Sequence, residues 1–194
     1  MDFYRQKGKK KKDILKHLSD WYKKSGISGN MRIEAISDRH FQILFSNINS
    51  DIENNIADVG YGCSQVLPII VSGNSLVEGS TFIVQEPEIH LHPKAQAELG
   101  TFFYNLTRKK IQTLIETHSE HLLLRLQAHV ASKKSNLSPD DIKIFYISKE
   151  NGKHEYKEIK LNKDGYFAED WPKGFFPERY LEAKKIASKS LEIG

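Results

Sequence analysis

The sequence contains very little cysteine and no long apolar run. Its 194 residues include a single cysteine, Cys63, so neither an internal disulfide nor a zinc site built from thiolates can form within one chain. No apolar stretch approaches the roughly 20 residues that a membrane-spanning helix needs, and the lysine-rich start has no apolar segment behind it. We therefore expect a protein of the reducing cytoplasm with no membrane partner.

The remaining composition is typical of one globular domain, with 39% hydrophobic and 28% charged residues and a net charge of +4. Much of the positive charge comes from a cluster near the start: Lys7, Lys9, Lys10, Lys11 and Lys12. Such a cluster can neutralise nucleic-acid phosphates, which makes DNA a candidate partner. It is more often a solvated, partly disordered arm, so the lysines alone assign no function.

Apolar periodicity predicts the elements of the first third of the chain. Residues 13–26 have the spacing of an amphipathic helix that ends at Gly26. Residues 32–36 and 41–45 predict an antiparallel strand pair, and the asparagine-rich stretch 47–55 predicts an exposed loop rather than a packed element.

The middle of the chain predicts an α/β fold. Apolar runs at 81–84 and 112–115 flank a helical pattern that begins at Pro93, which is the order of a strand, a helix and a second, parallel strand. Because these runs do not alternate with polar residues, we expect the two strands to be buried on both faces. A helix over 120–132 and a hairpin of 142–148 and 153–161 around Asn151-Gly152 should follow.

The segment TFIVQEPEIHLHP, residues 81–93, places polar residues directly after the first parallel strand. Ligands bind at that end of open α/β sheets, so we expect Glu86 and Glu88 to point two carboxylates into a crevice there. A carboxylate so placed can orient and deprotonate water for attack on a γ-phosphate, while its neighbour on the strand holds Mg²⁺. Acidic residues that favour the following helix dipole would account for the two glutamates, but not for the rest of the pattern.

Two further segments accompany this one. In DVGYGCSQVLPII, residues 58–70, glycines introduce an apolar run, and a helix N-terminus after glycines can bind phosphate through its backbone N–H groups. In LIETHSEH, residues 114–121, His118 follows the second strand, where an imidazole can bind a γ-phosphate, although a lone histidine there is more often structural.

The order and spacing of the three segments resemble those of the motifs of ABC-type ATPases. The sequences EPEIHLHP and ETHSEHLL are similar to those of the RecF/SMC/OLD kind rather than to those of transporters. The resemblance implies a signature motif at Gly62, Ser64 and Gln65, a catalytic glutamate at Glu86, a switch histidine at His118 and a D-loop over residues 90–93, which include His90 and His92. We expect Gly60, in the glycine turn before the helix, to contribute to nucleotide binding as well. It implies ATP and Mg²⁺ as cofactors, head-to-tail pairing on ATP, and roles in DNA repair or phage defence.

Three regions follow from this reading. Residues 1–57 hold the basic arm, helix and hairpin, residues 58–161 the C-terminal ATPase lobe, and residues 162–194 a tail. The tail contains WPKGFF and is similar to a WPxGFF segment of unknown role in one subgroup of these ATPases. Its aromatic residues Trp171, Phe175 and Phe176 predict a tail held by burial rather than a ligand site.

Two departures from the pattern matter for activity. The chain contains no GxxxxGK[ST] phosphate-binding loop, or P-loop, and the Mg²⁺-binding strand position, usually a carboxylate, is Gln85, whose amide oxygen is a neutral and weaker ligand. We therefore expect the C-terminal part or split subunit of an ATPase, completed by a P-loop-bearing lobe or a second subunit and inactive alone.

Two alternatives stay open at the sequence level. A metal-dependent hydrolase could be built on His90, His92, His118 and Glu86, because alternate residues of an extended segment face the same side. A catalytically silent interaction fragment would share the ATPase fold and differ only in activity.

Overall fold

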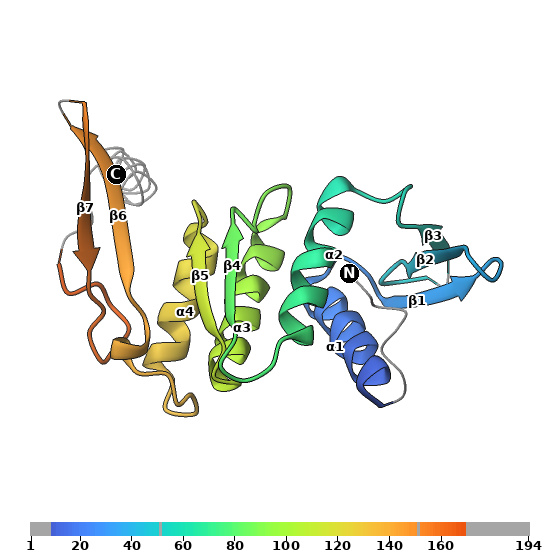
Figure 1. Cartoon of the computed structure of the whole chain (residues 1–194), viewed down its shortest axis with the longest axis horizontal. Coiled ribbons are helices and arrows are strands. Elements are labelled where there is room, and N and C mark those ends of the chain that lie inside the picture. The colour runs from blue at the N-terminus through green and yellow to red at the C-terminus, as the bar shows by residue number, and fades with distance from the viewer. Residues whose placement is uncertain (1–8, 51, 151, 170–194) are drawn as a thin grey trace, which may run out of the picture. The chain divides into compact units, whose positions relative to one another are not determined.

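The computed structural model describes residues 9–50, 52–150 and 152–169 (Figure 1). The described residues form two compact units, with the boundary between Leu126 and Gln127. Helix α4 (Glu120–Ala131) crosses the boundary between them. The fold is α/β, with one parallel and two antiparallel strand groups, as expected from the sequence.

Helix α1 (Lys9–Ser25) begins four residues before the predicted start. The lysines from Lys9 to Lys12 are therefore helical and are not part of a loose arm, whereas Lys7 lies outside the described residues. The helix ends as predicted at Gly26, whose φ of 80° is the left-handed conformation that closes many helices. Leu18 and Tyr22 are fully buried and make α1 part of the core.

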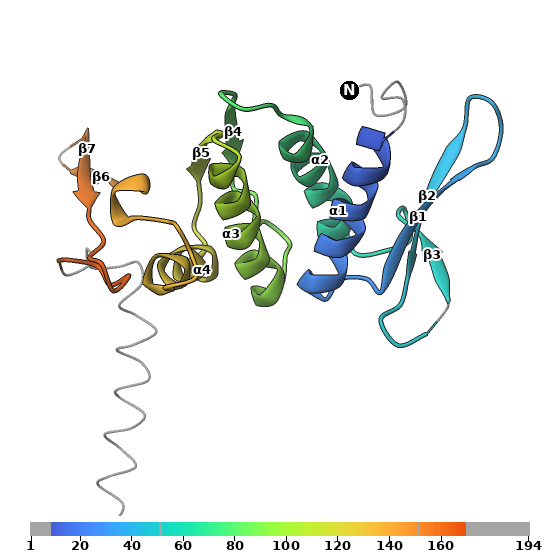
Figure 2. The same ribbon diagram turned by 90° about the horizontal axis from the view of Figure 1, so that it is seen from below.

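Strands β1 (Asn30–Ala35) and β2 (Phe41–Ser46) form the predicted antiparallel pair. The loop predicted over 47–55 is partly wrong, because β3 (Glu53–Asn55) adds to β2 as a third strand (Figure 2). The Asn55 amide donates a hydrogen bond to the Gln42 side chain at 3.2 Å. A short strand of polar residues pairs through its backbone, so hydropathy does not reveal it.

Three helices build the core of the first unit. Helices α2 (Tyr61–Ser75) and α3 (Pro93–Arg108) pack against α1 and against each other (Figure 2). The buried cluster draws apolar side chains from all three, among them Leu18, Val66, Ile70, Leu99 and Phe103. The Trp21 indole N–H also donates to the Glu98 carbonyl at 3.3 Å, which ties α1 to α3.

Strands β4 (Thr81–Gln85) and β5 (Gln112–Glu116) pair in parallel around α3, as predicted. The expectation of burial on both faces is wrong. Alternate residues are exposed, and Ile83 and Leu114 on the open face have 70% and 62% of their surface accessible. Within the described residues no element covers this face, whereas Phe82 and Ile115 of the opposite face pack against the core.

The second unit contains the predicted hairpin, formed by β6 (Ile144–Glu150) and β7 (Lys153–Ile159). A 3-10 turn, η2 (Pro139–Asp141), precedes it and is closed by a capping box between Ser138 and Asp141. The predicted tail residues Trp171, Phe175 and Phe176 lie outside the described residues. Among the described helices, none combines the length and apolar character needed to span a bilayer.

Candidate nucleotide site

Glu86 and His118 meet at the carboxyl ends of the two parallel strands. Gln85 and Glu116 are cross-strand partners, and the Glu86 N–H donates to the Glu116 carbonyl at 2.8 Å. The Glu86 Oε1 and His118 Nε2 atoms are 3.3 Å apart, and the histidine side chain is 65% exposed. A carboxylate and an imidazole that two strands place together can act on one bound group, but their catalytic roles stay predictions.

The turn after β4, residues 86–91, has an unusual backbone. Glu86 and His90 adopt left-handed conformations, with φ of 43° and 62°, which usually cost a non-glycine residue roughly 1–3 kcal/mol. Two hydrogen bonds brace the turn, from the Ile89 N–H to the Glu86 carbonyl and from the Leu91 N–H to the Glu88 carbonyl. Strain of this kind gathers at functional sites, which supports a functional role for the turn.

Glu88 does not point into the crevice as the sequence led us to expect. Its side chain is buried, and its Oε1 accepts a hydrogen bond from the His118 N–H at 2.6 Å. Its Oε2 atom has no hydrogen-bond partner among the described residues. Glu88 therefore fastens the turn after β4 to the loop that carries His118, a role that only the parallel pairing of the strands reveals.

The predicted signature residues form the start of α2. Gly60 is the N-cap and offers no side chain to the first helical N–H groups, and the first turn carries no acidic residue. The Ser64 hydroxyl donates to the Tyr61 carbonyl at 2.9 Å, and the Gln65 Oε1 atom is buried without a hydrogen-bond partner among the described residues. An uncapped helix N-terminus of this kind favours an anion.

Tyr22 and Cys63 fix the position of α2. The Tyr22 hydroxyl donates to the Cys63 carbonyl at 2.6 Å, in the buried contact between α1 and α2. Burial raises the pKa of the Tyr22 phenol well above its usual value, and burial likewise raises the pKa of the Cys63 thiol to about 12. Both groups are therefore neutral at physiological pH and act in packing rather than in proton transfer.

Gly62 is where α2 touches the turn after β4. A Cβ atom at this position would overlap the His90 carbonyl oxygen and would lie 2.9 Å from the His90 carbonyl carbon. Glycine thus allows the start of α2 and the turn after β4 to pack backbone against backbone.

We expect Gly62→Ala to lower the free energy of unfolding by about 1–3 kcal/mol, because the added methyl group forces two backbones apart. Urea unfolding of the purified chain measures the loss. Gly60→Ser is the matched control: a Cβ there meets no atom within 4 Å, and its hydroxyl can cap the helix. Equal stability of Gly62→Ala and the unchanged chain would contradict this contact.

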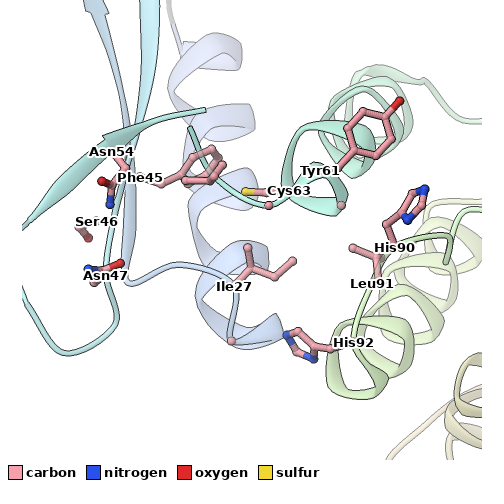
Figure 3. A pocket seen from close by; sticks show the side chains of 14 residues that line it. Ile27, Phe45, Ser46, Asn47, Asn54, Tyr61, Cys63, His90, Leu91 and His92 are labelled. Atoms are coloured by element: carbon pink, nitrogen blue, oxygen red, sulfur yellow. The ribbon is translucent and has the colours of Figure 1, made fainter. Parts of the chain in front are cut away.

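A cavity of about 470 Å³ lies between the start of α2, the turn after β4 and the end of β2 (Figure 3). His90 faces Tyr61 on its rim, with ring centroids 5.1 Å apart in an edge-to-face arrangement. His92 is the N-cap of α3, and its Nδ1 atom accepts a hydrogen bond of 3.4 Å from the Ala95 N–H. His90 therefore lies beside the start of α2, whereas His92 caps the N-terminus of α3.

The four residues of the alternative metal site do not gather. Glu86 and His118 pair with each other, while His90 and His92 are engaged as described above. Within the described part of the chain, no group of three or more His, Cys, Asp or Glu side chains could hold a metal ion. A metal-dependent hydrolase built on these residues is therefore not supported.

The oxygen donors at the strand ends nevertheless suit Mg²⁺. Gln85 lies on the open face of the sheet and presents an amide oxygen there, next to Glu86 in the chain. Mg²⁺ prefers oxygen ligands and commonly takes only one or two from the protein, with water and phosphate completing its shell. The absence of a three-residue cluster is therefore compatible with a Mg²⁺-nucleotide site.

Comparison with solved structures identifies the fold. A chain from work entitled "Structural biochemistry of ATP-driven dimerization and DNA stimulated activation of SMC ATPases" matches with a TM-score of 0.57 and 12% identity, over 90% of this chain and 92% of that one. The Smc head domain of Pyrococcus furiosus bound to the C-terminal domain of ScpA matches with a TM-score of 0.57 and 11% identity, over 92% of this chain. An SmcHead bound to the C-winged helix domain of ScpA matches with a TM-score of 0.58 and 12% identity, over 78% of this chain.

This chain spans only 37% and 44% of the latter two chains. At these identities the likeness shows the fold alone, which is that of an SMC-type ATPase head.

Sequence comparison adds the family. Among curated proteins, no sequence is significantly similar to this chain. Residues 137–182 match a family described as a protein of unknown function, DUF3696, which covers most of the WPKGFF-containing tail. Residues 4–123, more than half of the chain, match the family described as AAA ATPase domain. The chain therefore belongs to the AAA ATPase domain family, and its fold is that of an SMC-type head.

Proposed function

We propose that this chain is the C-terminal lobe of an ABC-type ATPase and hydrolyses ATP when a P-loop-bearing lobe completes the site. The observation that carries the proposal is the pair formed by Glu86 and His118, 3.3 Å apart at the carboxyl ends of two parallel strands. Glu86 orients the attacking water, and His118 binds the γ-phosphate. When bound, Mg²⁺ neutralises charge on the phosphates.

The open face of β4 and β5 supports the need for a second lobe. Parallel sheets in α/β proteins are covered on both faces, and two strands alone are marginal. Here Ile83 and Leu114 are mostly exposed on the same face as Gln85 and Glu116. A P-loop-bearing lobe that covers this face would bury the two apolar side chains and bring its phosphate-binding loop to the strand ends.

The start of α2 supports head-to-tail pairing. Its uncapped N–H groups lie at the edge of the cavity beside His90 and Tyr61, and the first turn carries no acidic residue that would repel an anion. We propose that Gly60, Gly62, Ser64 and Gln65 receive the γ-phosphate of a nucleotide bound to the P-loop of a second subunit.

DNA is the macromolecular partner that we propose for the assembled ATPase. One protein of the same fold is described as a DNA-stimulated ATPase, and α1 of this chain begins with consecutive lysines. We further propose that the assembled ATPase acts in DNA repair or phage defence.

We expect the isolated chain to show no ATP turnover above background, because phosphoryl transfer depends on positioning and charge stabilisation that a P-loop supplies. The completed assembly should turn ATP over. It consists of this chain and the P-loop-bearing lobe of another member of the family, either fused ahead of Met1 or added separately. Phosphate release by each component and by the mixture is the measurement. Robust turnover by this chain alone, abolished by Glu86→Gln, would contradict the proposal.

A further inference from the structure

Strand β4 ends in an amide side chain, Gln85, where the resemblance to ABC-type ATPases predicts a metal-binding carboxylate, and β5 carries a carboxylate at the paired position. Gln85 ends β4 and Glu116 ends β5, and the two are direct cross-strand partners in the parallel pair. Adjacent strands lie about 4.8 Å apart, so side chains at paired positions on one face are neighbours.

Both side chains lie on the open face of the sheet. In both strands exposed and partly buried residues alternate. Gln85 and Glu116 are exposed on the same face as Ile83 and Leu114, and the intervening residues of each strand face the core. Glu116 has no ion pair or side-chain hydrogen bond within the described residues, unlike Glu88, whose Oε1 is engaged with the His118 N–H. The Glu116 carboxylate is therefore available to a ligand that approaches from this face.

We propose that Glu116 supplies the negatively charged ligand of the nucleotide-bound Mg²⁺, with the Gln85 amide oxygen as its neutral companion. A hard divalent cation binds a carboxylate more strongly than an amide, and one or two protein oxygens suffice when phosphates and water fill the other positions. Compared with the pattern that the resemblance predicts, the metal-binding carboxylate is on β5 instead of β4, at the same edge of the sheet. Glu86, the next residue after Gln85, then stays free to orient water.

This inference rests on the proposed function, because Mg²⁺ enters as the partner of ATP. It can nevertheless be tested on the complete chain alone, with Mn²⁺ as the probe. Paramagnetic Mn²⁺ broadens the amide signals of nearby residues, so NMR spectra of the labelled chain locate even a weakly bound ion. We expect broadening centred on Gln85 and Glu116.

Three variants make the test sharp. Glu116→Gln should weaken localised Mn²⁺ binding at least about tenfold, because the site loses its charged ligand. The exchanged pair, Gln85→Glu with Glu116→Gln, should restore binding, since the charge returns to the usual strand. Glu78→Gln is the matched control: this exposed glutamate pairs with Lys110 before the opposite end of β4, and its loss should change nothing.

Unchanged broadening in Glu116→Gln, or no localised broadening in the starting protein, overturns the inference. Failure of the exchanged pair to restore binding, in a chain whose spectrum is otherwise native, overturns it as well. ATP turnover of the completed assembly tests the proposed function separately. An assembly that never hydrolyses ATP while Mn²⁺ still binds at Glu116 would refute that function and leave the metal site intact.

Discussion

Glu86→Gln should reduce ATP turnover of the completed assembly by about 10²–10⁴-fold, the usual contribution of a positioned general base. The amide keeps the size of the carboxylate but can neither accept a proton from water nor pair with an imidazolium at His118. Nucleotide binding should persist, because the phosphates are held by the P-loop and by the cation. The variant should therefore accumulate as an ATP-bound pair, seen as a larger species by light scattering in the presence of ATP.

The control for this result is Glu78→Gln, which makes the same chemical change at an exposed position paired with Lys110. It should hydrolyse ATP at the unmodified rate. Normal hydrolysis by Glu86→Gln would show that Glu86 is not the general base and that the carboxyl end of β4 does not supply the catalytic carboxylate.

Ser64→Arg should prevent ATP-dependent pairing of the completed assembly. Ser64 lies in the first turn of α2, where its small hydroxyl is satisfied by the Tyr61 carbonyl. An arginine would fill the space through which the second subunit's phosphate must approach the helix. We expect association to weaken at least about 30-fold, which corresponds to a hot-spot loss of about 2 kcal/mol.

Sedimentation of the assembly with and without ATP measures this effect. Ser75→Arg is the matched control, because Ser75 ends the same helix, its hydroxyl bonds a helix carbonyl in the same way, and a cation suits that end. It should pair normally. The two main variants should also differ from each other, since Glu86→Gln accumulates pairs and Ser64→Arg forms none. Pairing of Ser64→Arg on ATP would exclude the signature role of α2.

Local patterns predicted the strand, helix and strand around the site, because apolar spacing and the proline at the start of α3 are properties of neighbouring residues. They also placed Glu86 and His118 at one edge, since parallel strands must end together. Coverage of the sheet could not be predicted. The apolar run from Thr81 to Val84 is typical of a strand that is buried on both faces of a sheet. Whether the second face is covered depends on other elements, which the run itself does not specify.

The contacts that the site residues make with other side chains and with the backbone could not be predicted from the sequence either. Glu86 and Glu88 are two residues apart and chemically identical, yet one is partly exposed beside His118 and the other is buried on the His118 backbone. The left-handed turn between them decides this difference, and its conformation is not encoded by glycine. Likewise, the pairing of Gln85 with Glu116 depends on strand register across 30 intervening residues, which no local pattern specifies.

The burial of Cys63 gives the chain a built-in reporter of local opening. The single cysteine of the protein lies in the first turn of α2 near Phe45 (Figure 3), and its thiol is protonated at neutral pH. Its backbone carbonyl accepts the hydrogen bond from the Tyr22 hydroxyl. Because the thiolate is the reactive form and the Cys63 side chain is buried, a labelling reagent should react slowly until the packing around the start of α2 opens. The rate at which the native protein takes up such a label thus reports how often the packing at the start of α2 opens, without any engineered tag.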